Sequence, residues 1–448
     1  MSARPLPPGP RWLRPLNFLQ AGLTPPVPVL ARLAARYGDP FRVSYFSRPV
    51  TFTGNPDALR AIYTASPDCF DVWGGSFIEP VFGATSVVVV SGERHRQDRN
   101  ILAPAFSGPA MRAYGETMAA VAEEKMAQVD AARPFLMLDV TQRITLDIMI
   151  RVVFGMQDEE RITRTRAAVL ELIESLHVIL FLFPSARRVL GNHGPWARNR
   201  RAVEALCALL LQQMRARRAS ASPGQDLLGR MLAARYDDGS AMGEAQVLDQ
   251  LRGLLFAGHE ATATVLAWIF HWLGREPEVL ERVAQEIDDL GAEPAPEALA
   301  ALPYLEAVCK ECLRLYPPVV DPARVVRAPF ELLGYTIPAG EVLRASSALL
   351  HARPELYPEP GRFRPERFLE HRYSPFEYIP FGGGARRCLG AAFAMYEMKV
   401  VVATILRSHC LRLLDTRPVA HARRALSLGP QGGIPMVARR RRAPARRC

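Results

Sequence analysis

The amino-acid sequence predicts a mainly helical protein with small β-sheets. Residues 111–156 are rich in alanine, glutamate and methionine, and residues 159–218 form a second stretch of helical composition. Residues 245–274 are apolar over a longer length, which predicts a helix buried on most sides. After Pro317 the composition changes, because proline and glycine recur and short strand-like segments alternate with turns.

The remaining elements follow along the chain without an internal repeat. Proline-rich residues 1–30 predict an extended arm. Short strands are expected at 41–45, 50–53, 331–337 and 341–345, helices at 276–290, 302–315 and 389–407, and a hairpin-like stretch around Gly429, Gly432 and Gly433. We therefore expect an arm at 1–30, one domain at 31–438 and a basic tail at 439–448.

Composition limits the class of protein. The 448 residues are 49% hydrophobic and 23% charged, which is ordinary for a globular chain able to enclose a cofactor and excludes disorder as the main state. The net charge of +11 comes partly from the tail and suggests a basic face. Such a face suits an acidic protein partner or nucleic acid, but no aromatic residues interleave with the basic ones as nucleic-acid binding would favour.

The cysteines and the apolar runs indicate in which cellular compartment the protein is expected. The seven cysteines are irregularly spaced, and the first residues lack the apolar core of a leader peptide. Apolar runs at 81–90 and 176–186 are shorter than the roughly 18 residues of a membrane-spanning helix. The expectation is a cytoplasmic protein without disulfides or a membrane anchor.

The strongest local signal is the loop of residues 381–390, which reads FGGGARRCLG. Its glycines let the backbone turn tightly and approach a flat ligand closely. A helix expected directly after Cys388, together with Arg386, would favour a thiolate. Two other interpretations remain: a phosphate cradle, although the lysine of a P-loop is absent, and a buried structural cysteine.

This loop resembles the haem-binding signature of the cytochrome P450 family. The matching positions are Phe381, Gly382, Gly384, Arg386, Cys388 and Gly390. The resemblance extends from about residue 35 to 436 and implies a single triangular, haem-enclosing domain. It also implies haem b with Cys388 as the ligand of the iron, because a thiolate ligand favours O–O cleavage.

A second constellation supports the resemblance. Glu311 and Arg314 are three residues apart in a predicted helix and so share one face, as in an ordinary helical ion pair. In the family, such a pair is completed by an arginine at the position of Arg367, and the triad is structural. Cys309 and Cys312 form a CxxC inside the same helix, where core packing is the better interpretation than metal binding.

Several cationic residues match positions that hold the haem propionates in the family. His95 and Arg99 are four residues apart and share a helix face. Arg324 and Arg386 are the other candidates, and Arg327 is a rival to Arg324. Cationic donors suit carboxylates both by charge and by geometry.

Polar residues interrupt the apolar helix at 257–262, which reads AGHEAT. Small Ala257 and Ala261 would leave room above the haem, and Glu260 and Thr262 are candidates for proton delivery; alternatively, they form a local ion pair and a helix-backbone bond. The family usually has threonine where this chain has Ala261. That departure puts the usual proton relay in doubt.

The resemblance implies a monooxygenase acting on a lipophilic molecule such as a terpenoid, fatty acid or polyketide. The pocket is expected to draw on Phe82, Leu254, Ala257, Ala261, Val319, Val320 and Ile434. No nucleotide-binding domain is fused, so electrons would come from a separate acidic ferredoxin or flavodoxin. A bacterial-type monomer in secondary metabolism fits best.

Two rival functions remain. A haem-thiolate peroxygenase, isomerase or dehydratase would not need the O₂ and reductase cycle, and Ala261 keeps this alternative open. A basic protein that binds nucleic acid or an apolar ligand without chemistry would be colourless.

Overall fold

The structure is a computed structural model that describes residues 5–10, 26–45, 48–106, 108–131, 133–176, 194–220, 224, 226–424 and 427–441. Helices dominate and the sheets are small, which confirms the predicted fold class. The chain divides into two compact units. Unit 1 comprises residues 1–73, 303–391 and 417–432, and unit 2 comprises residues 74–302, 392–416 and 433–448.

Unit 1 contains most of the strands. Its helices are α2 (Pro26–Tyr37), α3 (Pro56–Thr64), α16 (Pro303–Leu315), α17 (Ser347–Leu350) and α18 (Arg367–Glu370). Its strands are β1 (Phe41–Tyr45), β2 (Arg48–Thr53), β3 (Phe70–Val72), β5 (Ala323–Val326), β6 (Phe330–Leu332), β7 (Tyr335–Ile337), β8 (Val342–Ala345), β10 (His421–Arg424) and β11 (Ser427–Pro430). Five strands form one sheet in the order β1-β2-β8-β5-β3, in which only β2 and β8 run parallel.

Helix α3 shows how this unit positions its loops. Asn55 caps the helix by accepting from the backbone N–H groups of Asp57 and Ala58, and Pro56 occupies the first turn. Leu59 and Ile62 on its inner face are fully buried against the sheet. The opposite end of α3 therefore has a fixed position, and Tyr63 lies there.

Unit 2 is built mainly from helices. These are α4 (Gly75–Phe82), α5 (Gly92–Leu102), α6 (Gly108–Ala127), α7 (Met137–Ile148), α8 (Glu159–Glu174), α11 (Gly194–Ala219), α12 (Leu227–Ala233), α13 (Glu244–Arg275), α14 (Pro277–Asp288), α15 (Pro296–Ala300) and α19 (Ala391–Ser408, from its second residue). A π-helical turn, Met149–Val153, extends α7. Strands β4 (Phe135–Leu136), β12 (Pro435–Arg440) and β9 (His409–Leu413) form its sheet in that order.

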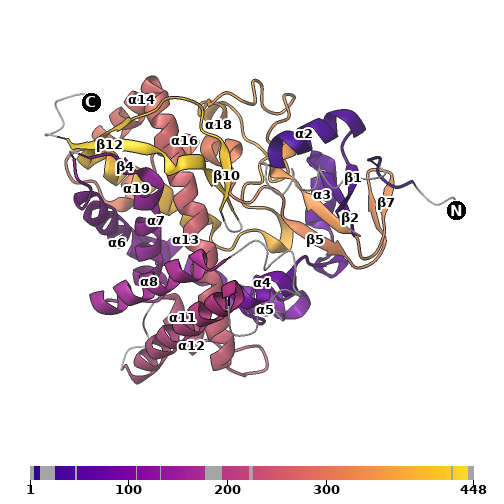
Figure 1. Cartoon of the computed structure of the whole chain (residues 1–448), viewed down its shortest axis with the longest axis horizontal. Coiled ribbons are helices and arrows are strands. Elements are labelled where there is room, and N and C mark those ends of the chain that lie inside the picture. The colour runs from indigo at the N-terminus through magenta and orange to yellow at the C-terminus, as the bar shows by residue number, and fades with distance from the viewer. Residues whose placement is uncertain are drawn as a thin grey trace. The chain divides into compact units, whose positions relative to one another are not determined.

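Helix α13 is the predicted apolar helix, and it extends one residue further at each end than expected. It packs along α7 and also contacts α11 and α14 (Figure 1). Within the described part of the chain, it alone is long and apolar enough to span a membrane, and 83% of its most apolar window is buried inside the protein. Core packing therefore accounts for its composition.

Several sequence-based expectations about local structure were wrong. The strand expected at 331–337 is a hairpin, because Leu333 and Gly334 both adopt positive φ and turn β6 into β7. The helix expected directly after Cys388 begins at Ala391. Residues 26–30 of the expected arm are helical, whereas residues 5–10 are extended and pair through Pro5 and Pro8 carbonyl groups with Thr336 and Arg42.

The start of the expected tail is also ordered. Arg439 and Arg440 belong to β12, and Arg441 forms an ion pair with Asp288 at 2.5 Å. Cys410 is disulfide-bonded, which contradicts the expectation of a chain without disulfides. Residues 1–4, 11–25, 177–186 and 442–448, on which parts of the arm, the apolar run and the tail were expected, lie outside the described residues.

Candidate functional site

The cysteine loop belongs to unit 1 and presents an exposed cysteine. The Cys388 N–H donates to the Phe381 carbonyl at 2.9 Å and the Arg387 N–H donates to the Gly384 carbonyl at 3.0 Å, so the loop closes on itself. Gly382 and Gly384 both have positive φ, near 65°, a conformation that favours glycine. Cys388 is exposed, at the end of the loop that its hydrogen bond to Phe381 closes.

The loop is anchored on α3 by close contacts that only glycine allows. A Cβ atom on Gly383 would lie 2.3 Å from the Tyr63 ring, and one on Gly384 would lie 2.5 Å from the Tyr63 carbonyl oxygen. The glycine run therefore serves packing as well as turning. Besides these two contacts with Tyr63, the glycine run is held by Arg324, which donates to the Gly383 carbonyl at 3.0 Å.

Arg324, on β5, is a half-buried cation. Its guanidinium lies over the rings of Tyr63 and Phe70, at 5.2 and 5.4 Å from their centroids. Burial lowers the pKa of Arg324, and no acidic side chain contacts it among the described residues. Its rival Arg327 is half exposed and lies 3.5 Å from Asp71. A cation partly removed from water without an anionic partner is disfavoured, so the site of Arg324 would accept a carboxylate.

The structure brings Glu311, Arg314 and Arg367 together. The Glu311 carboxylate accepts from Arg314 Nε and Nη2 at 2.7 and 2.8 Å, and from Arg367 Nε at 3.1 Å. It also accepts from the backbone N–H of Arg364. All three triad side chains are almost fully buried. This network connects α16 to the segment around α18, which leads toward the cysteine loop.

The CxxC on α16 is part of the core. Cys309 and Cys312 are both fully buried free thiols. Burial raises the pKa of the Cys312 thiol well above its ordinary value, which disfavours a thiolate. We find no group of three or more potential metal ligands among the described residues.

In unit 2, α5 carries His95 and Arg99. His95 is buried and Arg99 is half buried, one turn apart on the same helix. Arg386, the fourth candidate contact for the haem carboxylates, belongs to the cysteine loop in unit 1 and is also half buried.

On α13, a stretch of small residues lies open in an otherwise buried helix. Ala257 is exposed and Gly258 and Ala261 are half buried, whereas the six residues before them and most of those after are buried. Glu260 and Thr262 are buried, and the Thr262 hydroxyl is 3.4 Å from the Gly258 carbonyl. Burial lowers the pKa of His259 to about 4, so this imidazole is neutral at pH 7.

The expected pocket residues differ in exposure. Phe82, Leu254, Val320 and Ile434 are buried, and Phe82 packs edge-on against Phe256. Val319 is 52% exposed.

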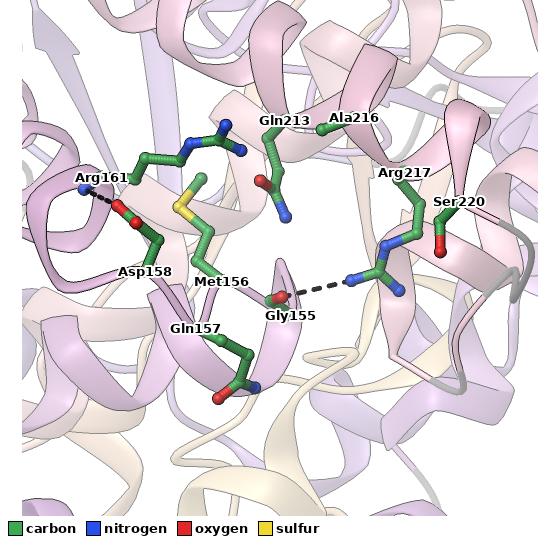
Figure 2. A pocket seen from close by; sticks show the side chains of 9 residues that line it. All are labelled: Gly155, Met156, Gln157, Asp158, Arg161, Gln213, Ala216, Arg217 and Ser220. Atoms are coloured by element: carbon green, nitrogen blue, oxygen red, sulfur yellow. Dashed lines mark hydrogen bonds between the residues drawn. The ribbon is translucent and has the colours of Figure 1, made fainter.

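A cavity of about 240 Å³ lies elsewhere in unit 2 (Figure 2). It is lined by Gly155, Met156, Gln157, Asp158, Arg161, Gln213, Ala216, Arg217 and Ser220, none of which the sequence singled out. Arg217 reaches the Gly155 carbonyl and is paired with Asp226, and Asp158 caps α8 through the Arg161 N–H. These groups already have partners within the fold, so the cavity adds nothing to the site.

Sequence reasoning missed a polar network between α5 and α13. Asp98 is fully buried one residue before Arg99, and it accepts hydrogen bonds from Gln246 and Gln250 of α13. The available signal was two glutamines one turn apart near the start of an apolar helix. This signal was overlooked because a buried glutamine and a solvated one look alike in the sequence. Only the partner that the glutamine binds in the folded chain distinguishes them.

Comparisons with known proteins agree with this picture. A family model for cytochrome P450 matches residues 6–433. The chain is 34% identical over 417 residues to putative cytochrome P450 135B1 of Mycobacterium tuberculosis, with 91% of this chain and 85% of that protein covered. It is 33% identical over 423 residues to putative cytochrome P450 138 of Mycobacterium bovis, with 92% of each covered.

Solved structures share the fold. One described as "Retinoic acid bound cyanobacterial CYP120A1" superposes with a TM-score of 0.85 at 27% identity, covering 98% of this chain and all of that one. A cytochrome P450DA haem domain also gives a TM-score of 0.85, covering 99% of this chain and 98% of that one, and at 23% identity it supports the fold alone. This chain belongs to the cytochrome P450 family and is a haem-dependent oxidoreductase of the monooxygenase class.

Proposed function

We propose that this enzyme inserts one oxygen atom from O₂ into a lipophilic small molecule, with haem b held by the Cys388 thiolate. When bound, haem supplies the redox chemistry of oxygen insertion. The single observation that supports Cys388 most is its exposure on a loop that is fixed by contacts with α3 and Arg324. By contrast, Cys309 and Cys312 of the same unit are buried.

The residues of each unit, taken separately, fit a flat cofactor that carries carboxylates. Unit 1 offers the exposed thiol together with Arg324, a half-buried cation that lacks an acidic partner among the described residues. Unit 2 offers the open stretch of Ala257 and Ala261 in a helix that is otherwise buried. We assign Arg324, Arg386, His95 and Arg99 to the cofactor's carboxylates, and Arg324 rather than Arg327 because Arg327 is solvated beside Asp71.

We assign Glu260 and Thr262 to proton delivery at the O₂-binding position. Both side chains are buried on α13, next to the open small residues. The long 3.4 Å contact between the Thr262 hydroxyl and the Gly258 carbonyl leaves that hydroxyl weakly held, so it can turn to another acceptor. The neutral imidazole of His259 donates from Nδ1–H to the Leu255 carbonyl at 2.8 Å and holds no charge that would compete with Glu260.

The substrate is a lipophilic molecule of the terpenoid, fatty acid or polyketide type. Apolar Phe82, Leu254, Val319, Val320 and Ile434 are the proposed contacts, and mostly apolar linings select apolar ligands. The cyanobacterial structure with retinoic acid bound supports this class, since retinoic acid is a terpenoid acid.

We place the enzyme in the bacterial cytoplasm as a monomer that takes electrons from a separate acidic ferredoxin or flavodoxin. The net charge of +11 favours an acidic donor. Secondary metabolism is the proposed setting, because the substrate class belongs there.

The test is the carbon monoxide difference spectrum of the dithionite-reduced protein. We expect wild type to show the strongly red-shifted Soret band of thiolate-ligated haem, and Cys388→Ser to lose it because serine provides no thiolate. Cys69→Ser, a half-buried cysteine of the same unit, is the matched control and should keep the band. A wild-type protein without haem, or a band retained in Cys388→Ser, would overturn the assignment.

One observation favours a second function. The family's usual threonine is replaced by Ala261, so a peroxygenase, isomerase or dehydratase that bypasses the O₂ and reductase cycle is the alternative. Turnover with hydrogen peroxide and none with a reductase system would select it.

A further inference from the structure

The first turns of α13 carry a polar stripe formed by Gln246, Asp249, Gln250 and Gly253. These positions follow the i, i+3, i+4, i+7 spacing of one helix face. Gln246 and Gln250 are buried, and Asp249 is nearly so. Buried polar side chains on a core helix are costly unless they are bonded, so their partners indicate what the stripe does.

Half of the stripe binds the backbone of residues 83–87. Asp249 accepts from the Thr85 N–H at 3.0 Å and from its hydroxyl at 2.8 Å. Gln250 accepts from the Val87 N–H at 2.8 Å and donates to the Thr85 carbonyl at 3.0 Å. A Cβ atom on Gly253 would lie 2.3 Å from the Ser86 hydroxyl, so this glycine allows the close approach.

The other half of the stripe holds Asp98 of α5. The carboxylate of Asp98 accepts from the Tyr236 hydroxyl at 2.7 Å, Gln246 Nε2 at 2.9 Å and Gln250 Nε2 at 3.0 Å. Arg94 Nε lies 3.3 Å from it. Asp98 itself has no exposed surface. Both carboxylate oxygens of Asp98 therefore accept hydrogen bonds. Each glutamine donates one amide N–H to Asp98, while Gln250 also donates to the Thr85 carbonyl and Gln246 to the Tyr236 hydroxyl.

The position of this network on α5 gives it a consequence for the site. His95 lies three residues before Asp98 and Arg99 one residue after it. The hydrogen bonds of Asp98 therefore hold α5 between the two side chains assigned to the cofactor's carboxylates. A side chain can hold a ligand in one geometry only if its helix is held.

We propose that Asp98 is a positioning residue that locks α5 onto α13 and thereby presents His95 and Arg99 to the haem carboxylates. This inference rests on the proposed function for His95 and Arg99. The attachment of α5 to α13 requires that both oxygens of Asp98 accept hydrogen bonds, because Gln246 and Gln250 of α13 each donate to one of them.

The test uses Asp98→Asn in the haem-loaded enzyme. Asparagine has the same shape but turns an amide N–H₂ toward one of the two glutamine donors. The matched control is Asp147→Asn, which removes another fully buried carboxylate of unit 2, held by Arg166 and Lys125. The rescue variant combines Asp98→Asn with Gln246→Glu, which reverses donor and acceptor in one bond and keeps the bond from Gln250.

Two readouts separate positioning from stability. The first is the rate of haem transfer to excess apomyoglobin, which we expect to rise about tenfold in Asp98→Asn, as for the loss of other groups that orient ligating side chains. Asp147→Asn should leave this rate within about twofold of wild type, and the double variant should restore it toward the wild-type value. The second readout is hydrogen exchange of residues 92–102, which should become faster only in Asp98→Asn.

Equal haem-loss rates in the two single variants would overturn the proposal, as would unchanged exchange of α5 in Asp98→Asn. A wild-type chain that binds no haem would refute the proposed function instead, while exchange of α5 would still decide whether Asp98 holds the helix.

Discussion

At the scale of single residues, Glu397 on α19 is a buried acid that makes the stability of the protein depend on pH. It is fully buried, and neither carboxyl oxygen has a hydrogen-bond partner among the described residues. Burial raises the pKa of this carboxyl well above its ordinary value, so the folded chain keeps the proton at pH values at which an exposed glutamate ionises. The unfolded chain ionises the same group above about pH 4.3. Unfolding therefore releases a proton, and stability falls as pH rises above the unfolded pKa.

We expect Glu397→Gln to be more stable than wild type by an amount that grows with pH. The gain should increase by up to about 1.4 kcal/mol per pH unit above about pH 5, because glutamine stays neutral in both states. Guanidinium unfolding of both proteins at several pH values measures it. The control is Glu171→Gln, since a hydrogen bond from Arg198 lowers the pKa of Glu171 and leaves it ionised in both states over this range. A difference independent of pH would contradict a protonated Glu397.

At the scale of elements, two threonines attach α7 to the part of α13 that carries the candidate site. The Thr141 hydroxyl donates to the Ala263 carbonyl at 2.9 Å, and the Thr145 hydroxyl donates to the His259 carbonyl at 3.1 Å. Donors and acceptors are both four residues apart, so the two bonds follow matching faces of the helices. They fix the backbone on both sides of Glu260.

Replacing both residues in Thr141→Val/Thr145→Val should therefore loosen this attachment. We expect the free energy of unfolding to fall by about 1 kcal/mol per hydroxyl, because valine keeps the shape but removes the buried hydrogen bond. Guanidinium unfolding measures the loss. Thr64→Val, which removes an exposed hydroxyl bonded to its own helix, should change stability by less than about 0.5 kcal/mol. Equal effects of the double variant and Thr64→Val would show that these bonds contribute nothing.

The sequence allowed α13 and the pairing of Glu311 with Arg314 to be predicted, because both follow from helical spacing alone. Arg367 is 56 residues from Glu311, and only the family resemblance suggested it. The hydrogen bonds of Asp98 could not be predicted, because they connect α5 with Tyr236 and with Gln246 of α13, which are both far from Asp98 in the sequence. The β6–β7 turn was missed because Leu333 adopts a positive φ that leucine rarely takes.

At the scale of the whole molecule, charge is the property that bears on the electron donor. The chain has 56 lysines and arginines against 45 acidic residues. Long-range attraction of this kind raises association rates more than it raises affinity, and salt screens it over about 10 Å at 0.1 M. An acidic donor should thus meet this enzyme quickly at low salt and more slowly at high salt.

We expect the rate of haem reduction by an acidic ferredoxin to fall about tenfold between about 0.05 and 0.5 M sodium chloride. Stopped-flow absorbance of the haem measures it. The control is the association rate of carbon monoxide with the reduced enzyme, which should not change with salt because this ligand is uncharged. If the reduction rate is as independent of salt as carbon monoxide binding, then charge does not guide the donor, and the net charge of +11 would have to be explained by another partner. If reduction slows while carbon monoxide binding does not, an acidic donor is supported, and the basic side chains responsible can then be found by single substitutions to glutamine.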